Sequence, residues 1–68
     1  MLKMFIKVYN QYGSYVGYSS TTWNRLEEDI KMEIAHHGLR NVSRIDVQLD
    51  GKVCKSLRVG DIKAKYAA

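Results

Sequence analysis

The side chains best suited to metal, acid–base or nucleophilic chemistry are few in this chain. His36 and His37 form its one histidine pair, and Cys54 is its single cysteine. Neighbouring positions on a helix point about 100° apart, so the two imidazoles are not expected to share a metal ion. A zinc site would need further Cys or His ligands at suitable spacing. We therefore expect neither a metal nor a cofactor.

Three further patterns resemble parts of catalytic sites, and each has a simpler explanation. Cys54 has no nearby histidine in the sequence, so it is expected to act as a small, partly buried hydrophobe. The three acids at 27–29 come early in a predicted helix, where acids complement the helix dipole. The segment 13–17 lacks the lysine and the flanking strand and helix of a phosphate-binding loop. The sequence therefore favours a non-catalytic protein.

Alternating side chains near the N-terminus predict a strand over about residues 2–10, because a period of two is typical of a strand with one buried face. One predicted face carries Leu2, Met4, Ile6 and Val8, and the other carries Lys3, Phe5, Lys7 and Tyr9. Tyr12 and Gly13 predict a turn. The segment 14–19 is rich in tyrosine and valine, and the pattern leaves open whether it forms a return strand.

One helix is expected over about residues 22–38. Its apolar stripe consists of residues three or four positions apart: Trp23, Leu26, Ile30, Ile34 and His37. This spacing predicts an amphipathic helix with the stripe buried. The hydroxyl residues at 20–22 are candidates for its N-cap, and Gly38 is a natural C-terminal residue.

A hairpin is expected over about residues 42–59, with Asp50 and Gly51 in its turn. A plain two-residue turn would pair position 49 with 52 and split the apolar side chains of the two strands between both faces of the sheet. We therefore predict either a longer loop or a β-bulge at Gly51 that restores the register. Residues 60–68 are expected to form a short tail or a single helical turn.

Together these elements predict a single α+β domain, 1–68, built of two layers. An antiparallel sheet of three to four strands carries one packed helix, in the order ββαββ or βαββ. A chain of 68 residues buries a thin core, and its one cysteine has no partner for an internal disulfide. Self-association would bury more surface, so a homodimer through the sheet edges or a helix face is one interpretation.

Composition also indicates a compartment. A single cysteine is typical of a reducing environment. Lysines interrupt the apolar residues of 1–7, so no signal peptide is expected, and no apolar stretch approaches the roughly 18 residues of a membrane span. We expect a cytoplasmic protein with no membrane partner. The terminal Ala67 and Ala68 resemble the degradation tails that bacterial proteases read.

Charge is unevenly divided along the chain, whose net charge is +4. Residues 22–38 hold four acids and two bases, whereas the remainder holds nine bases and three acids. In addition, cations alternate with aromatic rings on the polar face of the predicted sheet. This pattern suits nucleic acid or a nucleoprotein, because cations neutralise phosphates and rings stack on bases. The residues predicted to bind such a partner are Lys3, Lys7, Tyr9, Arg44, Lys52 and Arg58.

The tyrosines support a second interpretation, in which the chain docks on an acidic surface of a larger protein. Tyr12, Tyr15 and Tyr18 are interface candidates, because tyrosine contributes a large contact area at low entropy cost. The chain would then be an inhibitor or adaptor. Its size and sheet-plus-helix plan are similar to those of small phage or mobile-element proteins that block host defences, including anti-CRISPR proteins. No motif carries this similarity, so it assigns no residue a role.

Overall fold

The N-terminal alternation forms the first strand of the sheet. A computed structural model describes residues 3–66 and places β1 at Met4–Asn10, with Met4, Ile6 and Val8 buried. Leu2, in the predicted strand, and the tail Ala67–Ala68 lie outside the described residues. The return strand left open by the sequence is present as β2, Tyr15–Thr21.

The turn between β1 and β2 is held by one side chain. The Oδ1 atom of Asn10 accepts hydrogen bonds from the backbone N–H groups of Tyr12 and Ser14, each at 2.9 Å. Gly13 takes the positive φ of 81° that the turn requires and that glycine adopts without strain. Asparagine and glycine therefore close this hairpin, as their local chemistry favours.

The second hairpin contains the predicted bulge at a different position. It consists of β3, Val42–Leu49, and β4, Lys52–Arg58, joined by Asp50 and Gly51 with φ of 53° and 82°. The turn is the plain two-residue form, with Leu49 paired to Lys52. The register then shifts between Gln48↔Val53 and Val47↔Lys55, which leaves Cys54 as the extra residue. The predictions of a longer loop and of a bulge at Gly51 were therefore both wrong, because positive φ at both turn positions already closes a tight hairpin and the bulge lies at Cys54.

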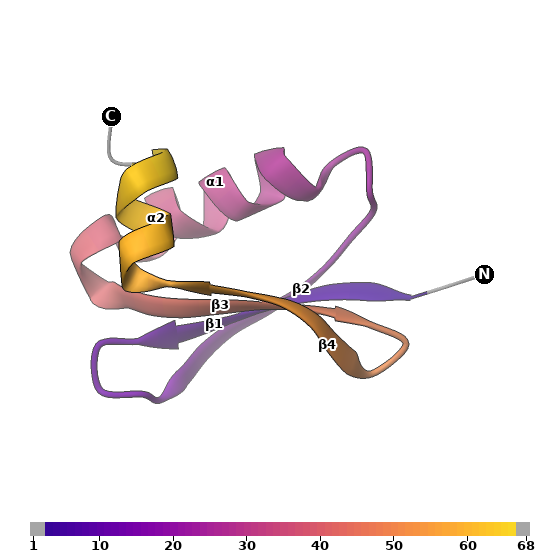
Figure 1. Cartoon of the computed structure of the whole chain (residues 1–68), viewed down its shortest axis with the longest axis horizontal. Helices are drawn as coiled ribbons and strands as arrows, with labels where there is room; N and C mark the ends of the chain where they lie inside the picture. The colour runs from indigo at the N-terminus through magenta and orange to yellow at the C-terminus, as the bar shows by residue number, and fades with distance from the viewer. Residues whose placement is uncertain (1–2, 67–68) are drawn as a thin grey trace.

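All four strands join one antiparallel sheet in the order β2-β1-β3-β4. Helix α1, Leu26–His37, crosses from the edge strand β2 to β3, and a short 3₁₀ turn, Leu39–Asn41, precedes β3. Both α1 and a second helix lie on the same side of the sheet, while the opposite side carries neither helix (Figure 1). The expected α+β class with an antiparallel sheet is confirmed.

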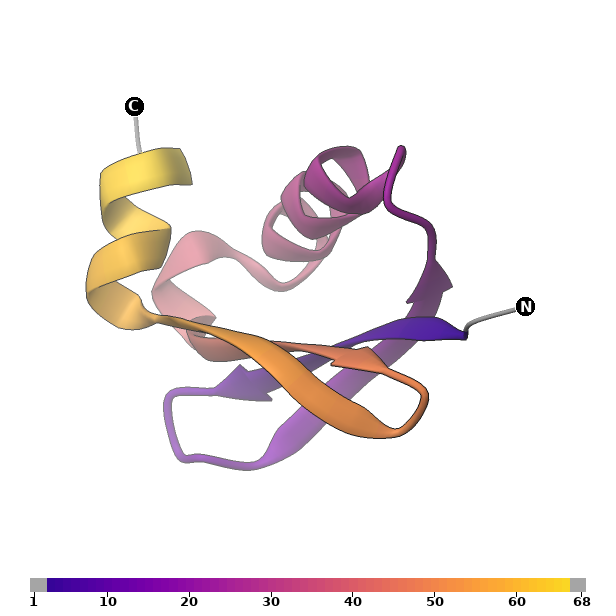
Figure 2. The same ribbon diagram turned by 45° about the vertical axis from the view of Figure 1, so that its right-hand side comes forward.

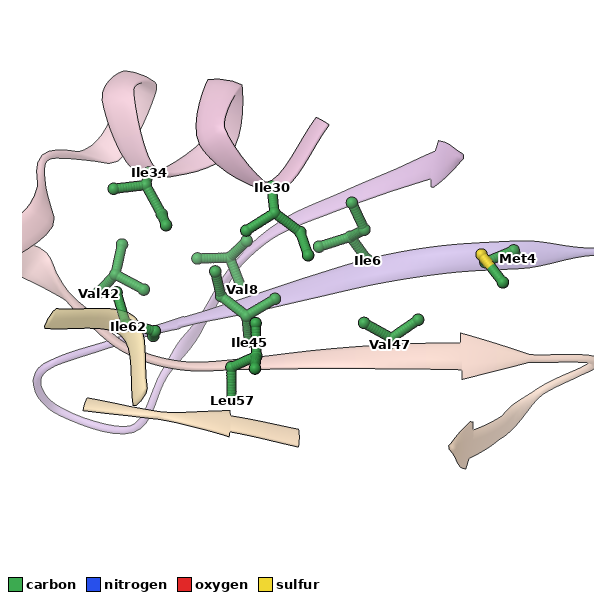
Figure 3. Close-up of a cluster of buried hydrophobic side chains, with 10 residues drawn as sticks. All are labelled: Met4, Ile6, Val8, Ile30, Ile34, Val42, Ile45, Val47, Leu57 and Ile62. Carbon is green, nitrogen blue, oxygen red and sulfur yellow. The ribbon is translucent and has the colours of Figure 1, made fainter. Parts of the chain in front are cut away.

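The core lies between the sheet and the helices. The buried side chains of the strands point to the helix side of the sheet, where they pack against side chains from both helices (Figure 3). The ten members are Met4, Ile6, Val8, Ile30, Ile34, Val42, Ile45, Val47, Leu57 and Ile62. Burying each aliphatic side chain of this size contributes roughly 1.5–3 kcal/mol. The core therefore depends on β1, β3 and α1, with one residue each from β4 and the second helix.

Helix α1 begins four residues later than the sequence predicted. Strand β2 continues to Thr21, which pairs with Met4, so the candidate caps Ser20 and Thr21 are strand residues. A turn closed by Arg25 N–H and the carbonyl of Thr22 then reverses the chain before the helix. Trp23 lies in this turn and is 64% exposed, so its predicted place in the buried stripe was wrong.

The expected tail at 60–68 is also corrected. Residues Val59–Tyr66 form a second helix, α2, packed beside β3 and β4 (Figure 2). The carboxylate of Asp61 accepts a hydrogen bond from the backbone N–H of Arg58 at 3.1 Å, where the chain leaves β4. Ile62 is buried in the core. The prediction had one packed helix, whereas the structure has two within residues 3–66. The second helix packs on the sheet because Ile62 completes the core.

Candidate nucleic-acid interface

The sheet face opposite the helices, here called the open face, is built from three residues of each strand. The strand registers place them in three rows that cross the sheet in the order β2, β1, β3, β4. The first row is Tyr15, Tyr9, Arg44 and Arg58, the second is Tyr18, Lys7, Asp46 and Ser56, and the third is Ser20, Phe5, Gln48 and Val53. Aromatic rings gather on β2 and β1, and arginines on β3 and β4.

Four rings on the β2 and β1 side form a continuous aromatic cluster, consisting of Phe5, Tyr9, Tyr15 and Tyr18. Phe5 and Tyr18 stack with centroids 4.8 Å apart and planes 11° from parallel. Tyr15 lies 6.0 Å from Tyr18 and 6.3 Å from Tyr9, with tilted and edge-on geometry. Tyr15 and Tyr18 remain 52% and 45% exposed. The cluster is therefore ordered by its own contacts and still presents ring surface to solvent.

A bulge in β2 places two of these tyrosines on the same face. Tyr15 and Tyr18 are three positions apart, and a regular strand would point them to opposite sides. The register shifts between Val8↔Gly17 and Tyr9↔Tyr15, so Val16 is the extra residue. Both tyrosines consequently lie beside β1 residues of the open face. Tyr12 lies instead in the hairpin turn, where it is 81% exposed.

Cations lie among and beside the rings. The ammonium of Lys7 is 5.4 Å from the Tyr15 ring centre and 5.9 Å from that of Tyr18. The guanidinium carbon of Arg44 lies 4.1 Å from the ring centre of Tyr9, within the range of a cation–π contact. Arg58, on the next strand, pairs directly with Arg44 across the ladder. Two arginines therefore meet at the end of the open face.

Asp46 orients part of this cationic surface, although the sequence alone gave no reason to place it among the binding residues. It is only 5% exposed, and its Oδ1 atom accepts a hydrogen bond from the Ser56 hydroxyl at 2.8 Å. The same oxygen lies 3.3 Å from Arg44 Nε, although that buried nitrogen makes no hydrogen bond within residues 3–66. Alternation along β3 puts Asp46 on the same face of the sheet as Arg44 and Gln48, so the signal for its position was available in the sequence. Its carboxylate and the Tyr9 ring together hold the Arg44 side chain in place.

A small hollow opens where the arginines meet the first hairpin. It measures about 200 Å³ and is lined by Tyr9, Gly13, Ser43, Arg44 and Arg58. Because two guanidinium-bearing side chains and a tyrosine border it, the hollow is suited to an anionic group such as a phosphate.

The structure brings together four of the six residues predicted to bind an anionic partner. Lys7, Tyr9, Arg44 and Arg58 share the open face. Lys3 precedes β1 and is exposed, with its backbone N–H bonded to the Asp50 carboxylate. Lys52 pairs with Leu49 and therefore lies on the helix side, which corrects its predicted position. The cause is the bulge at Cys54, which reverses the alternation of β4 on its two sides.

Three of the four acidic side chains of α1 accept hydrogen bonds from neighbouring elements on the helix side of the sheet. Thr21 donates a hydrogen bond to Asp29 at 2.6 Å, and Ser19 donates one to Glu33 at 2.9 Å. Glu27 accepts bonds from Lys65 and Tyr66 of α2. The acids therefore lie on the helix side and leave the open face with Lys7, Arg44 and Arg58 against the one carboxylate of Asp46.

Other classes of site find less support among residues 3–66. They contain no group of three or more His, Cys, Asp or Glu side chains placed to hold a metal ion. No helix of this part of the chain is long and apolar enough to span a membrane. Cys54 was expected to be partly buried but is exposed, because it is the bulged residue of an edge strand.

A comparison with known protein families, curated proteins and solved structures finds no match for this chain.

Proposed function

We propose that this protein is a non-catalytic binding module whose open face engages nucleic acid, alone or within a nucleoprotein. The observation that carries the proposal is the arrangement of four contacting aromatic rings beside Lys7, Arg44 and Arg58 on a sheet face that neither helix covers. Phosphates require cations, and bases offer flat surfaces that stack on rings. The open face supplies both within three neighbouring rows of side chains.

The electrostatic part of this function has a measurable size. Each phosphate neutralised on a single strand contributes a slope of about −0.7 to the dependence of log affinity on log salt, and about −0.9 on a duplex. Contacts from Lys7, Arg44 and Arg58 would therefore give a slope of about −2 to −3. Such a protein would bind at low salt and weaken clearly on going from about 50 to 200 mM salt.

The test is a fluorescence anisotropy titration of labelled DNA and RNA at these two salt concentrations. Alanine variants of Lys7, Arg44 and Arg58 are each expected to weaken binding and to reduce the slope by nearly one unit. The matched control is Lys63→Ala, which removes the same charge from α2 on the other side of the sheet. Absence of binding at low salt, or equal losses in the control, would refute the proposal.

A second candidate function is docking on a protein, which two exposed apolar side chains favour. Trp23, in the turn before α1, and Met32, on α1 itself, are both largely exposed. Large apolar residues of this kind are common at the centres of protein interfaces. If nucleic acid does not bind, a stoichiometric complex that survives nuclease treatment and is lost in Trp23→Ala would establish this alternative.

A further inference from the structure

We infer that the open face takes single-stranded nucleic acid, with bases stacked on Tyr15 and Tyr18 and the backbone directed toward Arg44 and Arg58. This inference rests on the proposed function and specifies its ligand. It also assigns separate tasks to the two halves of the face: the rings of β2 contact bases, and the arginines of β3 and β4 contact phosphates.

The aromatic cluster has a use on a single strand that it lacks on a duplex. In a duplex the faces of the bases are stacked inside the helix, so a ring lying on a protein surface cannot reach them. In a single strand the bases can turn outward and stack on tyrosine. Tyr15 and Tyr18 are about half exposed and already fixed by contacts with Phe5, Tyr9 and each other. Little further ordering is needed before a base can bind.

The helices are placed unfavourably for a duplex. Proteins that read double-stranded DNA commonly insert a helix or a two-stranded ribbon into the major groove. Here α1 and α2 both lie on one side of the sheet (Figures 1 and 2), and the cluster lies on the other. Helix α1 also carries Glu27, Glu28 and Asp29 in its first turn. These acids would repel the phosphates that flank a groove. The basic surface and the helices therefore cannot act on one duplex together.

The rows of the open face indicate the path of the strand. Neighbouring β-strands are about 4.8 Å apart, so Arg44 is two strand spacings from Tyr15 and Arg58 is three, or about 14 Å. Arg44 covers the Tyr9 ring at 4.1 Å and Phe5 is stacked with Tyr18, so the exposed ring surfaces of Tyr15 and Tyr18 are the platform for bases. The backbone would therefore cross the sheet from the tyrosines of β2 toward the hollow at Arg44 and Arg58.

Lys7 links the two halves. Its ammonium lies between 5 and 6 Å from the ring centres of both Tyr15 and Tyr18. A cation at this position can neutralise the phosphate that joins two stacked nucleotides, because the bases and their connecting phosphate would both lie above β1 and β2. The same contact keeps the ammonium near the rings when no ligand is bound.

The experiment compares an oligothymidylate of about ten nucleotides with an abasic strand of the same length and charge, and with a duplex of the same length, which carries about twice the backbone charge. The wild-type protein is expected to bind the oligothymidylate about tenfold or more tightly than either of the others. A Tyr15→Leu/Tyr18→Leu double variant should lose this preference and keep the salt dependence. The Tyr15→Phe/Tyr18→Phe variant retains both rings and should keep the preference.

Two further variants separate the tasks. Arg44→Ala/Arg58→Ala should weaken binding to the oligothymidylate and the abasic strand by similar factors, so the ratio between them is retained. Tyr12→Leu removes an exposed tyrosine from the hairpin turn outside the cluster and should leave the ratio unchanged. Unchanged thermal midpoints of the leucine variants would show that the fold is intact.

The outcomes distinguish the inference from the function on which it rests. Equal affinity for the strand, the abasic strand and the duplex, still dependent on Lys7 and Arg44, would overturn the single-strand inference and leave the nucleic-acid function standing. No binding to any ligand at low salt would overturn both. A preference for the oligothymidylate that survives the leucine substitutions would show that bases are held elsewhere and would also overturn the inference.

Discussion

Gly17 of β2 lies directly against the imidazole of His37 at the end of α1. A Cβ atom at position 17 would be only 2.9 Å from His37 Nε2, and 3.4 Å from the Cβ of Val8. His37 Nε2 is in turn 3.3 Å from a carboxylate oxygen of Glu33, whose other oxygen accepts the Ser19 hydroxyl. The missing side chain at position 17 therefore allows the last turn of α1 to close on the edge strand.

This contact predicts a specific coupling. Gly17→Ala should displace the His37 ring from Glu33 and lower the free energy of unfolding by about 1 kcal/mol, because the atom that must move is at the end of a side chain and loses its contact with Glu33. In a His37→Ala background the space is free, so the same substitution should cost close to nothing. Urea unfolding of the two single variants and the double variant measures the coupling. Additive losses would show that the two residues do not compete for the same space.

A second prediction concerns α2 and its single buried anchor. Ile62 is 1% exposed and joins the core from a helix of eight residues. Ile62→Ala should lower the free energy of unfolding by about 2–4 kcal/mol, because it removes buried methyl groups and leaves a cavity. Lys63→Ala, one position along the same helix and exposed, should change it by less than about 0.5 kcal/mol. Equal effects in urea unfolding would contradict the docking of α2.

Elements with a long regular pattern could be predicted from the sequence, and short ones could not. The alternation of β1 and the Ile30–Ile34 spacing of α1 extend over several residues, so local pattern and tertiary burial agree. In α2 the apolar spacing involves only Val59, Ile62 and Tyr66, which is too short to separate a helix from a tail. The start of α1 was misplaced because Trp23 continues the helical spacing, although the chain is still turning at that point.

The open face shows a similar division. Alternation along β1 and β3 correctly placed Lys7, Tyr9 and Arg44 together. The positions of Lys52 and Tyr15 depend on bulges at Cys54 and Val16. A bulge is a property of two paired strands, and one strand's sequence does not reveal where its partner's register shifts. The pattern could therefore predict that a basic face exists, but not its complete membership.

A third prediction compares two glycines in different backbone conformations. Gly51 has a φ of 82° in the β3–β4 turn, whereas Gly60 lies within α2 with no positive φ. Neither has a neighbouring atom that a Cβ would meet. Gly51→Ala should therefore destabilise the protein by about 1 kcal/mol through backbone strain alone. Gly60→Ala should stabilise it by up to about 1 kcal/mol, because alanine has the higher helix propensity.

Thermal unfolding of these two variants checks the comparison. The midpoint should fall for Gly51→Ala and rise for Gly60→Ala. A Gly51→Asn variant should recover part of the loss, because asparagine tolerates a positive φ better than alanine does. Two shifts of the same sign would contradict the assignment of one glycine to a left-handed turn and the other to a helix.

The final prediction concerns the ion pair that links the two helices and its pH dependence. Glu27 accepts hydrogen bonds from Lys65 Nζ at 2.6 Å and from the Tyr66 hydroxyl at 3.0 Å. The bond from Lys65, followed by that from Tyr66, lowers the pKa of Glu27 below its ordinary value of 4.5. The folded protein therefore favours ionised Glu27. The stability that ionised Glu27 contributes is present above pH 4.5, and it is lost as the pH falls through the lowered pKa of Glu27.

Glu27→Gln should accordingly unfold at a lower temperature than the wild type at about pH 7, and the difference should shrink as the pH is lowered toward about 3. Lys65, the partner of Glu27, has the opposite pH dependence, because its stabilising form is the protonated one. The hydrogen bond to Glu27 raises the pKa of Lys65 above 10.5, so the stability it supplies is lost as the pH rises through that raised pKa. The matched control is Glu28→Gln, which removes a neighbouring acid from the same turn. If both variants lose equal stability at every pH, the effect belongs to the helix dipole and not to the contact with α2.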